Sequence, residues 1–291
     1  MIHIYMKKSF LFILILINIS FIYCQTDYYS PENIYRFAEY LYQTGDYQAA
    51  ANEFQRYIFS VHDSSRVDST LLKIGVCYQK EGDPDLSISF YQNLLKSTST
   101  TVLRDQAHYL TAKTYLHTGD YDKSALYIDK NLSAVSSGKV NFQMQKLLGI
   151  DYLYQQQWMD ARQQFSILLN SEYSDTTILR LNKFADEGER LDHKYPFMAG
   201  LLSTIIPGSG KVYAGRWEDG LFSFVSIGFY AWQCFDGFHR DGKRSTKGWV
   251  YGIMGSVFYL GNIYGSVIAA RLQNERTRDE FIHKLDLEIK W

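Results

Sequence analysis

The sequence has little proline and almost no net charge, and each shortage excludes a class of protein. Only four of its 291 residues are proline, whereas a chain built of short strands and turns usually carries more. Thirty basic residues against 31 acidic ones leave a formal net charge of −1. The chain therefore lacks the strongly basic surface of a nucleic-acid-binding protein. The composition predicts an all-α fold and no nucleic-acid partner.

Cysteine is also scarce, and no recognisable catalytic or metal-binding pattern is present. Cys77 and Cys234 lie in different regions, so we expect two small buried residues rather than a disulfide framework. The seven histidines show no metal-ligand spacing. Gly-Ser-Gly-Lys at 208–211 is no phosphate-binding loop, because Ile205 and Val212 replace the required glycine and hydroxyl residue. We expect no metal, no cofactor and no enzyme activity, with an enzyme of unrecognised type as the alternative.

The first 24 residues have the pattern of a secretory signal peptide. Two lysines precede an apolar run at 9–23, and Cys24 is the small residue before an expected cut at Gln25. Two alternatives are acylation of Cys24, which the bulky Tyr23 disfavours, and an uncleaved anchor. The pattern predicts export and a mature chain that begins at Gln25.

Columns of similar residues recur after this segment with a period of 37 residues. The turn positions are Gly45, Gly82, Gly119 and Gln156. Small residues occupy the columns seven before and five after each turn: Ala38, Gly75, Ala112 and Gly149, then Ala50, Ser87, Ser124 and Ala161. The column nine after each turn is large and apolar: Phe54, Tyr91, Ile128 and Phe165. Small residues let two antiparallel helices approach closely, and glycine caps the first helix in a left-handed conformation.

These columns resemble the tetratricopeptide repeat (TPR), most closely in segments 38–54 and 112–128. The resemblance covers about half of the chain and implies a TPR-like α-solenoid of about four helical hairpins. The period is 37 residues rather than the usual 34, so we expect a longer loop between repeats. Gln156 replaces the fourth glycine, so we expect a distorted fourth turn. A helical bundle is the alternative.

In a solenoid, the first helices of the repeats line one concave face. By the family pattern this partner-binding groove carries Tyr35, Glu39, Tyr42, Gln43, Gln79, Lys80, Tyr109, Lys113, His117 and Tyr154. Tyrosine combines a large contact area with a polar tip, so the groove suits a protein or peptide partner. The paired basic residues with which some TPR domains hold a terminal carboxylate are missing. Alternatively, several of these tyrosines only pack between repeats.

The composition changes after residue 195. An apolar stretch at 197–206 is too short to cross a bilayer, whereas stretches at 221–238 and 249–270 are longer. Five glycines in or near the last stretch permit close packing between membrane helices: Gly248, Gly252, Gly255, Gly261 and Gly265. A buried hairpin in a globular domain is the alternative. The expected segments are a signal peptide at 1–24, a solenoid at 25–173, a capping helix or connector at 174–195, a membrane-associated helical hairpin at 196–275 and a polar tail at 276–291.

The turn after the first apolar stretch has the spacing Pro-Gly-x-Gly-x-x-Tyr-x-Gly-Arg. Its residues are Pro207, Gly208, Gly210, Tyr213, Gly215 and Arg216. The spacing resembles that of two-transmembrane hairpin domains and of TPR-plus-hairpin membrane proteins of Bacteroidota, which imply no established activity. We expect a re-entrant turn that contacts membrane lipid, with an ordinary surface turn as the alternative.

Charge predicts the orientation of the two long stretches. The loop between them holds Arg240, Lys243, Arg244 and Lys247, and in a two-span topology it would face the cytoplasm. A three-span topology would reverse it. We therefore expect a non-enzymatic, membrane-anchored TPR scaffold that binds a protein partner at the periplasmic face of a bacterial inner membrane. The alternative is an accessory factor for membrane-protein insertion or transport, with the repeats as docking platform.

Overall fold

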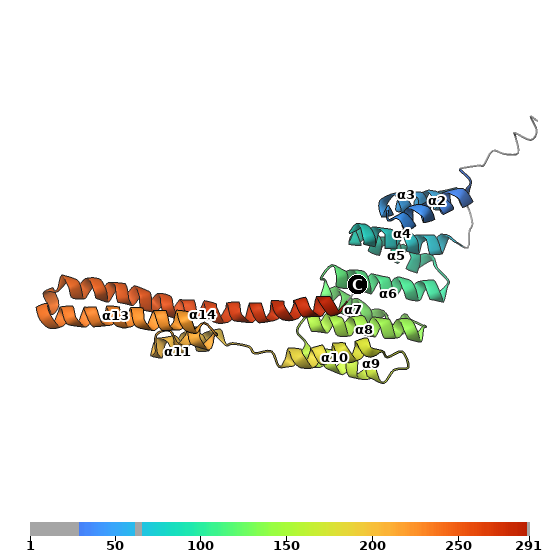
Figure 1. Ribbon diagram of the computed structural model, residues 1–291. Helices are drawn as coiled ribbons and strands as arrows, with labels where there is room; N and C mark the ends of the chain where they lie inside the picture. The colour runs from blue at the N-terminus through green and yellow to red at the C-terminus, as the bar shows by residue number, and fades with distance from the viewer. Residues whose placement is uncertain (1–28, 62–65, 290–291) are drawn as a thin grey trace, which may run out of the picture. The chain divides into compact units, whose positions relative to one another are not determined.

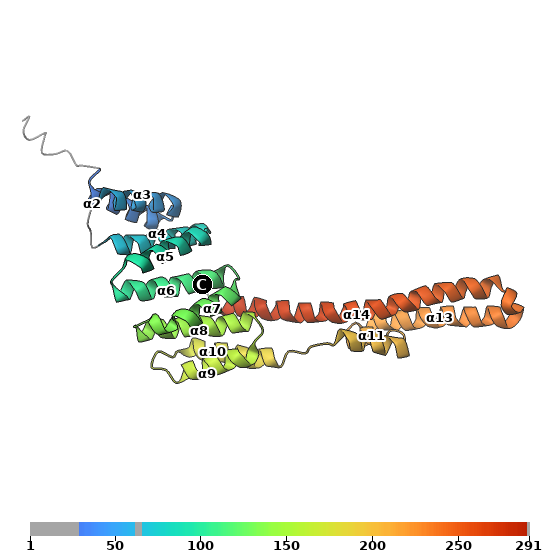
Figure 2. The ribbon, with the colours of Figure 1, turned by 180° about the vertical axis from the view of Figure 1, so that it is seen from behind.

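The computed structural model describes residues 29–61 and 66–289, which fold into helices without strands (Figures 1 and 2). The chain divides into two compact units, Met1–Leu179 and Arg180–Trp291. The expected signal peptide and its cleavage site lie outside the described residues. The all-α prediction is confirmed for the described chain.

The described part of the first unit contains four helical hairpins in succession, stacked in chain order (Figure 1). Each hairpin consists of a first and a second helix joined at one of the predicted turns. The helices are α2 (Pro31–Thr44), α3 (Tyr47–Ser60), α4 (Val67–Glu81), α5 (Pro84–Ser97), α6 (Thr101–His117), α7 (Tyr121–Asn131), α8 (Gly138–Tyr154) and α9 (Trp158–Leu169). The TPR-like solenoid of four hairpins is therefore confirmed.

All four turn residues adopt the left-handed backbone conformation, with φ of 87° at Gly45, 83° at Gly82, 76° at Gly119 and 60° at Gln156. At the fourth turn the Gln156 N–H donates to the Leu153 carbonyl (3.1 Å) and the Gln157 N–H to the Tyr152 carbonyl (2.8 Å). The three glycine turns make the equivalent bonds. The expected distortion of the fourth turn is wrong, because a non-glycine residue can take this conformation at an energetic cost.

The small columns are where the two helices of each repeat meet. The alanines and serines of these columns are fully buried, and so are the four large residues of the following column. A Cβ atom on Gly75 would lie 2.4 Å from the Tyr91 ring, and one on Gly149 would lie 2.5 Å from the Phe165 ring. Glycine therefore occurs in the small column where the opposing aromatic ring lies against the backbone.

The repeat of 37 residues is longer than the usual 34, and the additional residues do not all lie in loops. Only residues 98–100 separate α5 from α6, so the expected longer loop is wrong at this junction. Instead, α6 and α8 each have 17 residues. Between α7 and α8 the connection includes a short 3-10 helix, η1 (Leu132–Ala134).

The second unit is a helical hairpin with a shorter helical segment packed on it. Helix α10 (Thr176–Glu189) leads into it and spans the division between the units. The remaining helices are α11 (Pro196–Ile205), α12 (Ser209–Tyr213), α13 (Trp217–Asp241), η2 (Gly242–Arg244) and α14 (Thr246–Glu288). Helices α13 and α14 are antiparallel and in contact, and α11 and α12 pack against α14 (Figure 1). Among the described residues, one helix, α14, is long and apolar enough to cross a membrane, whereas α13, which contains the expected crossing at 221–238, does not meet the same criteria of length and composition.

Candidate partner-binding groove

The first helices of the repeats form one face of the solenoid. Helix α4 packs on α6, and α6 packs on α8, while α5 and α7 each lie between successive first helices. In a stack of helical hairpins, the layer in which successive helices touch is the inner side of the curve. The face of α2, α4, α6 and α8 is therefore the candidate groove.

Three side chains connect the first two repeats at this face. The Lys73 Nζ of α4 donates to the Tyr35 hydroxyl of α2 (3.0 Å) and forms an ion pair with Glu39. The Tyr35 ring also packs edge-on against Phe54 and Tyr57. Burial would lower the pKa of Lys73, but its hydrogen bonds to Glu39 and Tyr35 raise it on balance. Tyr35 and Glu39 are therefore held by contacts within the protein and are only partly available to a partner.

The second part of the groove combines aromatic and polar side chains. Tyr42 contacts Tyr47 edge-on, at 5.6 Å between ring centroids, and the Lys80 ammonium lies 5.1 Å from the centre of the Tyr47 ring. The Tyr91 hydroxyl donates to the Gln79 side chain (3.5 Å). Gln43 is exposed. Lys80 and Gln43 are the residues of this part with the most accessible side chains.

Helix α6 presents a row of three groove residues, one turn apart. Tyr109 and Lys113 are half-buried, and His117 lies at the end of the helix. Burial raises the pKa of Tyr109. Burial, and then repulsion from Lys80, lowers the pKa of Lys113. Partial enclosure of the ring, and then the charge of Lys113, lowers the pKa of His117.

The last of the predicted groove residues, Tyr154, packs between repeats. Its ring stacks on Tyr121 of α7, with a centroid distance of 4.6 Å and an interplanar angle of 2°. The predicted residues therefore all lie on first helices but differ in their contacts. Tyr35, Tyr42 and Tyr154 contribute to packing, whereas Gln43, Lys80, Lys113 and His117 present polar groups.

Sequence reasoning missed Lys73, Arg66 and Tyr47 as partners of groove residues. The Arg66 guanidinium lies 5.5 Å from the centre of the Tyr35 ring and also forms an ion pair with Glu32 (2.9 Å). Lys73 lies one residue after the groove column of its repeat, so the family pattern does not select it. The charges could have indicated this ion pair, because Glu39 and Lys73 carry opposite charges and are 34 residues apart, close to the repeat period.

The turn of the second unit uses its glycines for close backbone packing. Gly208 has a φ of 89°, and a Cβ atom there would lie 2.0 Å from the Gly220 carbonyl oxygen. A Cβ atom on Gly210 would lie 1.8 Å from the Ala199 carbonyl oxygen. Gly215 has a φ of 82° and open space around it. The turn therefore needs glycine at 208 and 210 for space, and at 208 and 215 for conformation.

The other residues of this turn have polar partners nearby. The Tyr213 hydroxyl accepts the Tyr195 backbone N–H (3.1 Å), and the Lys194 ammonium lies 5.1 Å from the centre of the Tyr213 ring. Arg216 forms an ion pair with Asp219 (2.5 Å). Pro207 is half-buried just before Gly208.

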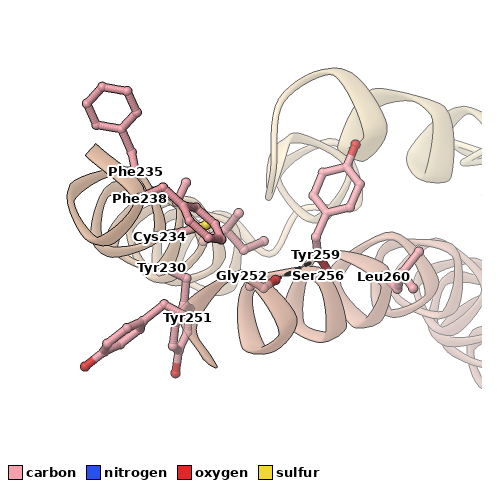
Figure 3. Close-up of a pocket in the computed structure, with 12 residues that line it drawn as sticks. Tyr230, Cys234, Phe235, Phe238, Tyr251, Gly252, Ser256, Tyr259 and Leu260 are labelled. Carbon is pink, nitrogen blue, oxygen red and sulfur yellow. Dashed lines mark hydrogen bonds between the residues drawn. The ribbon is translucent and has the colours of Figure 1, made fainter. Parts of the chain in front are cut away.

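An apolar groove of about 700 Å³ lies between α13 and α14 (Figure 3). Aromatic side chains of both helices line it, together with Cys234, Gly252 and Ser256. Of the five predicted glycines, four lie close to a facing residue: a Cβ atom would meet Phe238 at Gly248, Cys234 at Gly252, Tyr230 at Gly255 and Lys211 at Gly265. Gly261 has open space around it.

Two features of the described residues bear on chemistry: the grouping of metal-ligating side chains and the state of the Cys77 thiol. Over the described residues, no three His, Cys, Asp or Glu side chains lie close enough together to hold a metal ion. Cys77 is fully buried, and burial raises the pKa of its thiol to about 12, so this thiol is unreactive at neutral pH. The described residues of the solenoid groove present aromatic rings, amides and cations.

Comparison with known families gives a match within the solenoid. A tetratricopeptide repeat model matches residues 69–97, which form most of α4 and all of α5. Comparison with curated proteins gives no match. The second hairpin therefore matches a tetratricopeptide repeat in sequence, and the hairpins on either side of it have the same helical architecture.

Proposed function

We propose that the chain is a non-enzymatic, membrane-anchored scaffold that binds a protein or peptide partner along the first helices of its solenoid. TPR repeats in general mediate protein–protein interaction, and the matched repeat supports this general role. The observation that carries the proposal is the row of polar and aromatic side chains on α4 and α6, because these groups are accessible and belong to no catalytic set.

Membrane anchoring is supported by the surface of α13 and α14. Large apolar side chains are exposed along both helices, among them Phe222 (72%), Phe235 (68%) and Val257 (65%). Soluble monomers rarely expose apolar patches of this extent. Lipid chains would cover these side chains without any rearrangement of the hairpin. Membrane lipid is therefore the partner that we propose for the second unit.

Contacts within the second unit support an even number of crossings. Arg180 of α10 forms an ion pair with Glu288 at the end of α14 (2.9 Å), and Phe184 packs edge-on against Phe281. Lys194, just before α11, exchanges two backbone hydrogen bonds with the Asn274 side chain (2.8 and 2.7 Å). The segments before and after the hairpin then lie on the same side, as the two-span topology with a re-entrant α11–α12 segment requires.

The two-span topology also determines which parts of the chain face the periplasm and which face the cytoplasm. If the leader exports the repeats to the periplasm, the basic loop around η2 faces the cytoplasm of a bacterial inner membrane, as the positive-inside rule prefers. The expected segments at 1–24, 25–173, 174–195, 196–275 and 276–291 keep their roles in this proposal.

Crosslinking in intact cells, followed by purification of the full chain, tests the scaffold role. We expect a partner that is lost from the double variant Gln43→Ala, Tyr109→Ala and retained by the control Leu126→Ala, Gln163→Ala, which changes exposed residues of second helices. Melting curves of both variants control for loss of folding. An identical set of partners from both variants would refute the groove as the binding face. A membrane-protein insertion defect that persists without the repeats would favour the accessory-factor alternative.

A further inference from the structure

The first helices of the third and fourth repeats expose no carboxylate over the part of the chain that the structure describes. Helix α6 contains one, Asp105, and helix α8 contains one, Asp151, and both are buried. Asp105 accepts the backbone N–H groups of Ser136 and Ser137, the latter at 2.7 Å, and so fixes the start of α8. Neither carboxylate can neutralise a cation in the groove.

The cations in the middle of the groove lack an opposite charge. Neither Lys80 nor Lys113 forms an ion pair with a described residue. Glu81 follows Lys80 in sequence, but its Oε1 accepts the Gln48 backbone N–H (3.0 Å) of the first repeat. Lys80 and Lys113 are close enough for their charges to repel, although they come from adjacent repeats.

The first repeat shows the opposite arrangement on the same face. Lys73 is paired with Glu39, and Arg66 is paired with Glu32. Cations at that end of the groove are therefore neutralised within the protein. Lys80 and Lys113, at the contact between the second and third repeats, form no such ion pair with a described residue.

The surroundings of this pair suit a peptide with negative charge. Lys113 is half-buried, and charge–charge attraction is stronger at a partly desolvated site than in bulk water. His117 lies one turn beyond Lys113, and Tyr109 lies one turn before it. On α6, the Lys113 ammonium therefore lies between the His117 imidazole and the Tyr109 ring.

We propose that the middle of the groove, at Lys80, Lys113 and His117, binds an acidic segment of the partner protein, rich in Asp or Glu side chains. Carboxylates there would relieve the repulsion between the two lysines and would gain an attraction that the protein does not supply itself. Tyr109 would contact the apolar part of the segment. The inference depends on the proposed function of this groove as the partner site.

Fluorescence anisotropy with a defined probe tests the charge preference. The probe is a fluorescein-labelled twelve-residue peptide of Glu-Glu-Gly repeats, titrated with the full chain in neutral detergent micelles. Gln-Gly and Lys-Gly peptides of equal length serve as comparisons. We expect saturable binding of the Glu peptide alone, and binding that weakens as salt rises from 50 to 300 mM.

A matched pair of variants locates the site. Lys80→Gln with Lys113→Gln should weaken binding at least tenfold. Lys96→Gln with Lys130→Gln removes the same charge from exposed positions on α5 and α7 and should change binding less than twofold. No binding of the Glu peptide, or an equal loss in both variants, overturns the acidic preference. If the Glu peptide does not bind but a partner is still photo-crosslinked from groove positions, the scaffold role is supported and only the acidic preference is refuted. If no partner is photo-crosslinked either, both proposals are refuted.

Discussion

Asp151 is a carboxyl group inside the solenoid with no hydrogen-bond partner for either oxygen. Its polar neighbour Ser124 donates its own hydroxyl to the Ala112 carbonyl (3.2 Å) instead. Burial raises the pKa of Asp151 to about 8; the nearby Ser124 hydroxyl opposes this increase in part, and the charge of Asp122 adds a smaller increase. The group is thus neutral in the folded protein at neutral pH and ionised in the unfolded chain.

We predict a pH-dependent stability from this group. Between its unfolded pKa near 4 and its folded pKa near 8, the folded state binds more protons, so the free energy of unfolding falls as pH rises. The limiting slope is about 1.4 kcal/mol per pH unit. Asp151→Asn should remove this slope, and Asp122→Asn, at an exposed position, should not. Urea unfolding of each full-length variant from pH 4.5 to 8.5 measures the effect. An unchanged slope in Asp151→Asn would contradict the account.

Gln156 offers a second test at the scale of a residue. Its left-handed conformation costs a non-glycine residue about 1 kcal/mol, so Gln156→Gly should stabilise the fold by up to that amount. Gly119→Ala is the reciprocal control at the same position of the preceding repeat and should destabilise by about 1 kcal/mol. Chemical denaturation measures both changes. Stabilisation by both substitutions would show that the turn conformation is not the cause.

The helix pairs of the solenoid could be predicted from the sequence because each depends on residue size in a few columns. Ala38 and Ala161 are fully buried in these columns, and Ser124 contacts the backbone at Ala112 directly. The tertiary pairing of Lys73 with Glu39 could not be predicted, because Lys73 lies outside the columns of the family pattern. Cys77 and Thr114 occupy the column of Asp151 in the two preceding repeats and are buried as well, so the column marks a buried position there. The carboxyl group that fills this position in the fourth repeat departs from the pattern and could not be predicted from it.

The columns predict the effect of overpacking one helix pair. Ala38→Leu or Ala161→Leu introduces three carbon atoms between two helices and should cost about 1–3 kcal/mol. Ala134→Leu, in the exposed connection before α8, is the control and should have little effect. Thermal melts of the full chain provide the measurement. Equal melting temperatures for all three variants would mean that the columns do not mark the helix contacts.

The proposed membrane topology of the α13–α14 hairpin gives a prediction about sidedness. In the two-span topology an impermeant thiol reagent added to spheroplasts should label Arg276→Cys and leave Lys243→Cys unlabelled, in a background without the native cysteines. Both positions are exposed, whereas the neighbouring Ser245 is buried and caps α14 through the Gly248 N–H (3.0 Å). The reverse pattern would support three crossings and would contradict the proposed topology.

At the scale of the whole molecule, the sequence predicted the order of parts better than their interactions. The change of composition near residue 195 indicated the apolar hairpin, because the number of apolar residues in a segment is a property of its composition. The continuous α14 could not be predicted, since it runs 43 residues across the expected boundary between the hairpin and the polar tail. Its packing on α10 involves side chains about 100 residues apart in sequence, Arg180 and Glu288.

The central claim is that the chain binds a protein partner along the first helices of its solenoid. Photo-crosslinking tests it most directly, with benzoylphenylalanine placed singly at Gln79, Tyr109 or Gln143 on first helices and at Leu86, Leu126 or Met159 on second helices. All six chains are compared in intact cells that naturally produce the protein. The account predicts discrete adducts of the same partner from the first three positions and none from the exposed apolar residues of the second three. Adducts from the second helices alone, or equally from both sets, would contradict it.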